Sequence, residues 1–134
     1  MKKWLLFLVV VLMFLLAACG SDKKSNGSSS KDEGGTIKVG VLASLTGPLE
    51  SYGKQTKQGF ELGLDYATDG KREVAGKKIE VVWEDTETKP EVAVQKATKL
   101  LEDDGVDFLV GSSSSGDTLA VLPLAEEYEK IMIV

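Results

Sequence analysis

The chain from Thr36 onward alternates short apolar runs with segments whose apolar residues recur at helical spacing. Four runs are nearly continuous in Val, Ile and Leu, which is typical of parallel strands buried on both faces. They cover residues 37–43, 79–83, 106–110 and 131–134. Three helical segments lie between them, beginning near Ser51, Thr88 and Leu119. The order β-α-β-α-β-α-β predicts an α/β fold, a doubly wound parallel sheet with helices on both faces.

The first predicted helix has an apolar side and a pair of glycines. Phe60, Leu64 and Ala67 lie on one side of it. Gly59 and Gly63 are one turn apart, and we expect this spacing to let the helix pack closely against the sheet.

The second predicted helix has a recognisable start. Thr88 and Glu91 have the spacing of a capping box, and Pro90 is tolerated in the first turn. Its buried face is predicted to consist of Ala93, Ala97, Leu100 and Leu101.

The third helix and the end of the chain carry two further signals. Leu119, Leu122 and Tyr128 mark the helix, and Pro123 within it predicts a kink or a restart. The fourth strand runs to Val134 and needs a following helix to cover it, so the chain is expected to be an N-terminal fragment.

The N-terminus resembles the export signal of a bacterial lipoprotein. Lys2 and Lys3 precede an apolar run of 15 residues that ends at Ala18, which suits a signal peptide better than a permanent membrane span. Leu16-Ala17-Ala18-Cys19 resembles a lipobox, which implies cleavage before Cys19 and acylation of its thiol. Residues 1–18 are therefore expected to form the signal peptide.

The next segment lacks large apolar residues. Residues 20–35 read GSDKKSNGSSSKDEGG, so burial cannot offset the entropy of ordering them. We expect residues 19–35 to be the lipidated cysteine and a flexible tether that holds the domain at 36–134 outside a membrane.

Composition excludes several kinds of chemistry. The chain has no His and one Cys, which excludes a Ser-His-Asp triad, a His-ligated metal and an internal disulfide within it. With 16 basic and 21 acidic residues and no basic stripe, nucleic acid is not expected as a partner. No cofactor or metal is expected.

The candidate binding edge is formed by the loops after the first three strands, because ligands of open parallel sheets bind at the strand carboxyl ends. The loop at 111–116 reads GSSSSG and leads into a helix, where hydroxyls and free N–H groups favour an anion such as a carboxylate. A plain polar connection is the alternative reading, and the residues alone leave both open.

The other two loops give weaker signals. Neither G-x-G-x-x-G nor G-x-x-x-x-G-K-[ST] occurs, which argues against dinucleotide and P-loop sites. Tyr52 could pack on the apolar part of a ligand or be a half-buried core aromatic. Glu84, Asp85 and Glu87 are expected to form a solvated acidic turn rather than a cation site.

Four segments together resemble the start of the type I periplasmic-binding proteins, in particular the branched-chain amino-acid (Leu/Ile/Val) substrate-binding proteins of ABC transporters. They read IKVGVL, LTGPL followed by YG, DGVDFLVG, and LPLAEE. The resemblance covers about Thr36 to Val134, and it depends on the order and spacing of the motifs. It implies an incomplete first lobe of a two-lobed protein.

The resemblance also implies a binding site. The family binds the ligand carboxylate with a serine shortly after the third strand, which falls on Ser115, with Ser114 as the neighbouring alternative and Gly116 beside it. The tyrosine that lines the family's pocket matches Tyr52. Ser112 replaces the proline of the common Gly-Pro loop start and is expected to contribute little to binding.

These expectations describe a lipid-anchored receptor on the outer face of the cell membrane, serving an ABC importer. It would capture a small carboxylate-bearing solute, a branched-chain or other amino acid, without covalent chemistry, and deliver it to permease subunits. One alternative is the ligand-binding part of a sensor or receptor for an aromatic acid or amide. An extracytoplasmic enzyme ranks last, since it would need a base or metal site from residues outside this chain.

Overall fold

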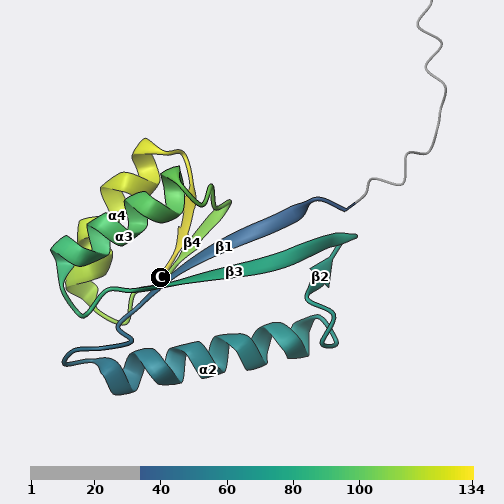
Figure 1. Cartoon of the computed structure of the whole chain (residues 1–134), viewed down its shortest axis with the longest axis horizontal. Coiled ribbons are helices and arrows are strands. Elements are labelled where there is room, and N and C mark those ends of the chain that lie inside the picture. The colour runs from purple at the N-terminus through teal and green to yellow at the C-terminus, as the bar shows by residue number, and fades with distance from the viewer. Residues whose placement is uncertain (1–33) are drawn as a thin grey trace, which may run out of the picture. The chain divides into compact units, whose positions relative to one another are not determined.

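The fold is described from a computed structural model, which covers residues 34–134 (Figure 1). The signal peptide, Cys19 and nearly all of the tether lie outside the described residues. The strands are β1 (Thr36–Ala43), β2 (Glu73–Val74), β3 (Lys77–Asp85), β4 (Phe108–Val110) and β5 (Ile131–Ile133). The helices are α2 (Glu50–Ala67), α3 (Pro90–Glu102) and α4 (Ser115–Glu127).

One sheet contains all the described strands, in the order β2-β3-β1-β4-β5. β1 is central and pairs in parallel with β3 and β4, and β5 pairs in parallel with β4. The parallel arrangement is the one predicted. The exception is β2, which pairs antiparallel with β3 through a two-residue turn whose residues, Ala75 and Gly76, both have positive φ.

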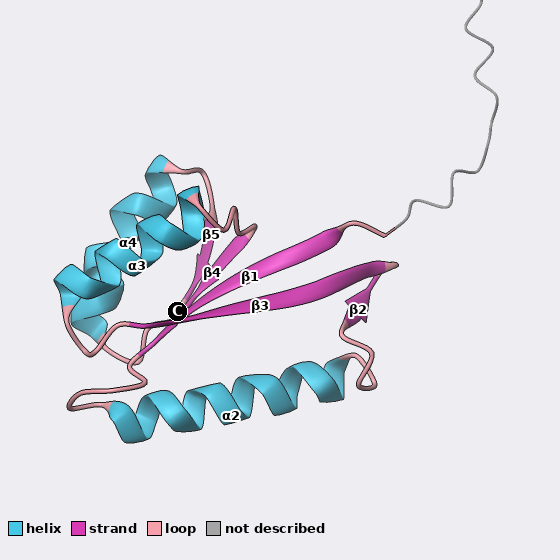
Figure 2. Cartoon of the chain, in the orientation of Figure 1, coloured by secondary structure: helices cyan, strands magenta, loops and turns pink. Residues whose placement is uncertain are grey.

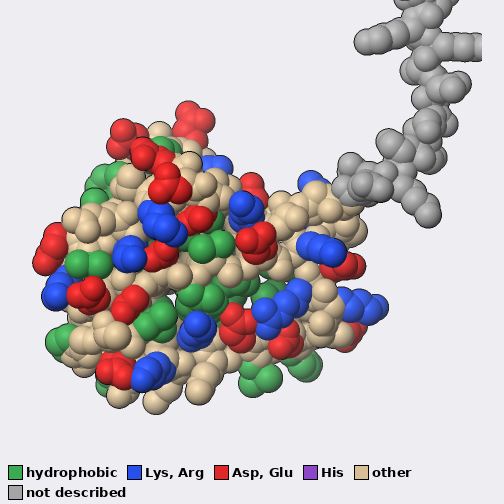
Figure 3. Space-filling view, in the orientation of Figure 1, with side chains coloured by type: hydrophobic (Ala, Val, Ile, Leu, Met, Phe, Trp, Pro, Cys, Tyr) green, Lys and Arg blue, Asp and Glu red, His purple; other side chains and the backbone are tan. Residues whose placement is uncertain are grey.

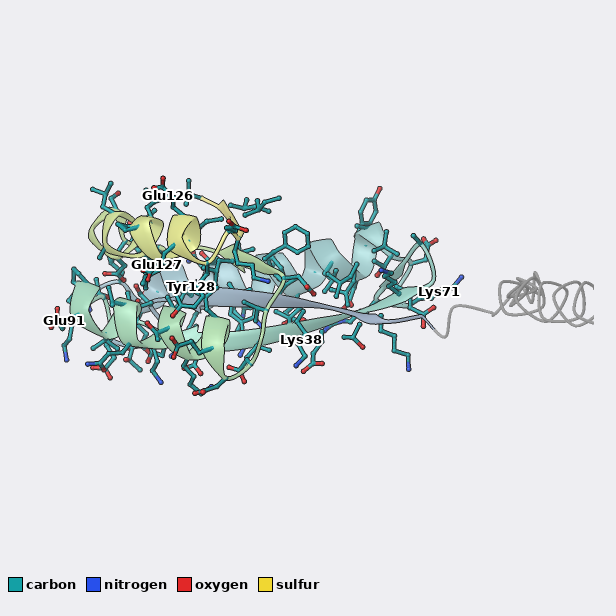
Figure 4. All side chains as sticks on the ribbon, turned by 90° about the horizontal axis from the view of Figure 1, so that it is seen from above. Lys38, Lys71, Glu91, Glu126, Glu127 and Tyr128 are labelled. Carbon is teal, nitrogen blue, oxygen red and sulfur yellow. The ribbon has the colours of Figure 1, made fainter. Side chains whose placement is uncertain are left out.

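The helices cover both faces of the sheet, as predicted. α2 lies on one face, and α3 and α4 lie side by side on the other (Figures 1 and 4). The core sits between this pair and the sheet, where Leu42, Leu100, Leu109, Val106 and Val121 are fully buried. At the end of α4, the Tyr128 hydroxyl donates to Glu102 of α3, which ties the two helices together.

The contact that α2 makes with the sheet differs from the prediction. Gly59 and Gly63 are exposed, with no atom within 4 Å of an added Cβ, and Ala67 is exposed as well. The glycine that packs closely is Gly53 in the second turn, where a Cβ would lie 2.0 Å from the Ser44 carbonyl oxygen. The predicted close approach was therefore wrong in position, because α2 meets the chain closely at its start.

Farther along, α2 is held to the sheet by an aromatic and ionic cluster. The rings of Phe60 and Trp83 meet edge to face with centroids 5.5 Å apart. The Trp83 indole N–H donates to Glu61 at 2.8 Å, and Glu61 also pairs with Arg72 at 2.6 Å. The Arg72 guanidinium in turn binds Asp65 and holds the pKa of that carboxyl below its ordinary value.

The start of α3 differs from the predicted capping box. Lys89 is the N-cap residue, without a side-chain cap, and the Thr88 hydroxyl instead accepts from the Leu49 N–H at 3.3 Å. Thr88 does not cap α3, because its hydroxyl binds the loop after β1 instead. Pro90 occupies the first turn as predicted. The predicted buried face is confirmed at Ala93, Ala97, Leu100 and Leu101.

The leucines that mark α4 in the sequence are not the residues that it buries. Leu119 and Leu122 are 68% and 41% exposed, whereas Asp117, Val121 and Ala125 are buried. These three lie four residues apart and turn toward the core shared with α3. The helix is assigned without a break across Pro123, so the predicted restart does not occur.

α2 leaves part of its face of the sheet uncovered. A hollow of about 380 Å³ lies there, and its lining is apolar. Its walls come from all five described strands and from α2: Ile37, Val39, Phe60, Val74, Ile79, Phe108, Val110 and Ile133. Figure 3 shows hydrophobic side chains between α2 and the sheet, within a surface that is otherwise strongly charged.

Candidate functional site at the strand carboxyl ends

The loops after β1, β3 and β4 meet at one end of the sheet, from which α2, α3 and α4 begin (Figure 2). Their backbones are in close contact. A Cβ on Gly111 would lie 2.0 Å from the Leu42 carbonyl oxygen, and one on Gly47 would lie 2.4 Å from that of Glu87. Both glycines also have positive φ, +114° and +83°. A side chain at either position is therefore excluded both by the nearby carbonyl oxygen and by the backbone conformation. The backbones of these loops and of β1 are therefore packed directly against one another at this end of the sheet.

Asp85, at the end of β3, organises the loop after β1. Its Oδ1 accepts from the N–H groups of Leu45, Thr46 and Glu87 at 2.9, 3.1 and 2.9 Å, and its Oδ2 accepts from the Thr46 hydroxyl at 2.7 Å. Partial burial acts to raise the pKa of Asp85, but these hydrogen bonds outweigh it and hold the pKa below its ordinary value. Asp85 is thus a structural anion.

Glu84 is also held in ion pairs within the fold. It pairs with Lys96 at 2.8 Å and with Lys99 at 2.6 Å, and its side chain is only 11% exposed. Burial raises its pKa, and the two lysines of α3 more than reverse this, leaving the pKa lowered. Glu87 pairs with Lys89 at 2.8 Å. The expectation of a solvated acidic turn was wrong, because these carboxylates have partners on α3 and on the loops.

The serine loop is folded by hydrogen bonds among its own residues. The Ser112 N–H donates to the Thr118 hydroxyl at 3.0 Å, and the Ser112 hydroxyl donates to Asp117 at 3.1 Å. The Ser114 N–H donates to the Ser112 hydroxyl at 3.2 Å. Ser114 is the N-cap of α4, and its hydroxyl accepts from the Asp117 N–H at 3.4 Å.

Ser115 and Gly116, the predicted site residues that follow Ser114, lie within the helix and not in the loop before it. Ser115 and Gly116 are the first two residues of α4, and both are exposed. Neither their N–H groups nor the Ser115 hydroxyl makes a hydrogen bond with another residue in 34–134. Free N–H groups at the start of a helix, with its positive dipole end, suit an anion. Ser114 differs from them, because its hydroxyl already caps the helix.

Tyr52 stands on the first turn of α2, at the same end of the sheet, and is 65% exposed. No hydrogen bond links it to the serine loop within the described residues. Of its two sequence readings, a half-buried core aromatic does not describe it. The structure thus places Ser114, Ser115 and Gly116 in succession at the start of α4, and Tyr52 exposed at the start of α2.

Two residues of the loop frame, Asp117 and Thr118, are not among the predicted site residues. Asp117 is completely buried, and Ser112 and Thr118 hold the loop with it. A sequence signal for Asp117 was present, since Ser114-Ser115-Gly116-Asp117 matches the capping-box pattern [ST]-x-x-[DE].

Two further findings concern the described residues alone. Within 34–134, His, Cys, Asp and Glu nowhere gather in a group of three or more that could hold a metal ion. In the same range, no helix has the length and apolar character needed to cross a membrane.

Comparison with known proteins agrees with this geometry. A parallel α/β lobe with free donors at its strand carboxyl ends is the architecture of a ligand-binding domain. Residues 36–134 match the family model described as periplasmic binding protein, and the chain belongs to that family.

Three relatives illustrate the match. The Leu/Ile/Val-binding protein BraC3 of Rhizobium johnstonii is 32% identical over 97 residues, which are 72% of this chain and 26% of that protein. A branched-chain amino acid ABC transporter protein of Rhodopseudomonas palustris is 43% identical with a TM-score of 0.70, covering 72% of this chain and 26% of its own. A solute-binding protein from the same species, solved with 3,4-dihydroxybenzoic acid, is 33% identical with a TM-score of 0.66 and the same coverages.

The matched region is the N-terminal part of such proteins. The chain spans about a quarter of the length of the relatives it matches. The predicted fold is confirmed: it is a partial lobe of a type I periplasmic-binding protein, and relatives of this family are solute-binding proteins of ABC transporters.

Proposed function

We propose that this chain is the N-terminal part of a receptor for an ABC importer, which binds a small solute through its carboxylate at the start of α4. The observation that carries the proposal is the set of free donors there, formed by the Ser115 hydroxyl and the N–H groups of Ser115 and Gly116. A carboxylate can accept several of these at once, and the helix dipole adds to the attraction.

The proposed solute is a branched-chain amino acid. Its support is the family match together with the Leu/Ile/Val-binding relative. Tyr52, exposed on α2 at the same end of the sheet, is proposed to pack against the apolar side chain of the solute.

An aromatic acid is the second candidate. The relative solved with 3,4-dihydroxybenzoic acid is 33% identical, which is as similar as the Leu/Ile/Val-binding relative. Both kinds of solute carry a carboxylate, so the serine loop alone does not distinguish them. The proposal for the loop therefore holds for either solute.

Location and partners follow from the N-terminus and the family. We propose that Cys19 carries the lipid anchor, that the lobe stands on the outer face of the cell membrane, and that permease subunits receive the solute. The same lobe could instead serve a sensor. A transmembrane segment after the second lobe would identify a sensor, and its absence from the full gene would identify the importer receptor.

Calorimetric titration of the full-length protein tests the solute class. The probes are L-leucine, L-isoleucine, L-valine and 3,4-dihydroxybenzoate, each beside its primary amide. We expect one acid to bind, and its amide to bind at least about tenfold more weakly because the amide brings no charge to the helix start. Equal affinity for an acid and its amide would contradict the carboxylate site.

A further inference from the structure

Asp117 is completely buried at the start of α4, and only one of its carboxylate oxygens is used. Oδ2 accepts from the Ser112 hydroxyl at 3.1 Å, while Oδ1 has no hydrogen-bond partner within residues 34–134. Burying a carboxylate costs free energy that hydrogen bonds offset. Its contact with Ser112 is therefore the one through which this side chain acts on the loop.

The contact completes an unusual helix cap. In a capping box, the N-cap side chain accepts from the third N–H, and the third side chain reaches back to the N-cap N–H. The first half is direct here, from the Asp117 N–H to Ser114 at 3.4 Å. The second half passes through Ser112, because the Ser114 N–H donates to the Ser112 hydroxyl and that hydroxyl donates to Asp117.

The two hydrogen bonds that run from the Ser114 N–H through the Ser112 hydroxyl to Asp117 form a relay. This relay determines which donors of the loop remain free. The Ser112 hydroxyl has one proton, which it donates to Asp117 Oδ2, and its oxygen accepts from the Ser114 N–H. The Ser112 N–H is taken by Thr118 at 3.0 Å. The N–H groups of Ser112, Ser114 and Asp117 are thus used within the loop. The Ser113 hydroxyl is buried without a hydrogen-bond partner within residues 34–134, and the exposed donors are those of Ser115 and Gly116.

We propose that Asp117 is the positioning residue of the solute site: through the Ser112 hydroxyl it fixes the serine loop so that Ser115 and Gly116 present their donors to the solute carboxylate. This rests on the proposed function and deepens it. It also reverses the expectation that Ser112 contributes little, since Ser112 links the acid to the cap.

The proposal separates hydrogen bonding from charge. Asp117→Asn keeps an oxygen that can accept from Ser112 and removes a negative charge near the bound carboxylate. Asp117→Ala removes the acceptor. If positioning is the role, Asp117→Asn should bind the solute as well as the parent or better, while Asp117→Ala should bind it more weakly.

The first arm of the test needs no ligand. Amide hydrogen exchange is followed in the full-length protein labelled with ¹⁵N-serine. In Asp117→Ala, protection of the Ser114 amide should fall by about tenfold or more, and in Asp117→Asn it should stay within about threefold of the parent. Asp103→Ala, an exposed change at the end of α3, is the control. Unchanged protection in Asp117→Ala, or equal loss in both variants, would overturn the positioning role.

The second arm measures affinity for L-leucine and 3,4-dihydroxybenzoate. Asp117→Ala and Ser112→Ala should each weaken binding by about tenfold. The double variant should bind no more weakly than the single variant with the lower affinity, because both changes remove the same contact. A double variant that loses about a hundredfold would refute the relay. If Asp117→Ala does not fold, unchanged affinity in Ser112→Ala refutes it as well. If the parent binds neither probe, the proposed solutes fail, and the exchange arm still decides the role of Asp117.

Discussion

At the scale of single residues, two side chains at the strand carboxyl ends have opposite tasks. Asp85 accepts four hydrogen bonds and consolidates the first loop. Ser115 makes none with the described residues and faces outward. Asp85 therefore contributes to the stability of this edge, and Ser115 is the residue that we propose for binding the solute.

Ser115→Ala should weaken binding of the solute by about tenfold to a hundredfold, because a hydrogen bond to a charged group contributes roughly 1.5–3 kcal/mol. The backbone donors remain, so binding should persist. Calorimetry on the full-length protein, with L-leucine and 3,4-dihydroxybenzoate, measures the change. Ser51→Ala, an exposed serine at the start of α2, is the matched control. Parent-like affinity in Ser115→Ala would show that the serine run is only a polar connection.

Asp85→Asn should destabilise the full-length protein by about 2 kcal/mol at neutral pH, because an amide cannot accept all four bonds. The pKa of Asp85 is lowered in the folded state, so its contribution is fully present above the unfolded-state pKa of about 3.9 and is lost as the pH falls through the folded-state value. Urea unfolding from pH 7 to pH 3 should show the two proteins converging toward acid. Asp69→Asn, at an exposed left-handed position that Asn tolerates, is the control. A pH-independent difference would contradict this account.

At the scale of elements, α2 is placed by its start, where its backbone meets the loop after β1. The chain leaves β1, turns through the first loop, and enters α2 with Gly53 against the Ser44 carbonyl. Beyond that point α2 is held by side chains, chiefly Phe60 and Glu61 against Trp83. The middle of α2 therefore tolerates changes that its start does not.

The glycines of α2 provide a direct test of this difference. Gly59→Ala should stabilise the protein by about 0.5–1 kcal/mol, because Ala has the higher helix propensity and the site is open. Gly53→Ala should destabilise it by about 2 kcal/mol, because the new Cβ meets the Ser44 backbone. Denaturant unfolding of the two variants checks both signs. Destabilisation by Gly59→Ala would mean that the middle of α2 packs more closely than described.

At the scale of the whole molecule, the hollow beside α2 differs from its surroundings in having an entirely apolar lining. Residues from both sides of β1 line it, and about three quarters of the length of the relatives lies outside the matched region. Apolar surface of this kind is stabilising when buried and promotes association when exposed.

A chain ending at Val134 should therefore unfold at lower denaturant than the full-length protein, and it should bind the dye ANS more strongly. The comparison is made at equal protein concentration, with the leader removed from both. Phe108→Ser, which replaces a ring in the hollow by a hydroxyl, should lower ANS binding only in the short chain. Equal unfolding midpoints and equal ANS binding would show that the lobe is complete without further segments.

The proposed anchor also belongs to this scale. Cys19→Ser should release the protein from the membrane fraction, because one changed atom removes the site of acylation. Cell fractionation measures it, and metabolic labelling with a fatty acid should mark the parent alone. A variant that stays with the membrane as firmly as the parent would place the attachment elsewhere.

The sequence by itself determined the order of elements and the parallel sheet. Continuous apolar runs and helical spacing are local patterns, so they can be read without knowing what packs against them. It also predicted that the polar loop at 111–116 connects the third strand to a helix, although the helix begins within that loop, at Ser115.

Only the tertiary structure decided which faces and which hydrogen bonds are used. The buried face of α4 runs through Asp117 rather than Leu119, because α3 lies beside it and the serine loop needs an acceptor. Gly53 rather than Gly59 packs closely, because the first loop folds back on the start of α2. Side-chain partners depend on distances between segments far apart in sequence, and a pattern along one chain does not contain those distances.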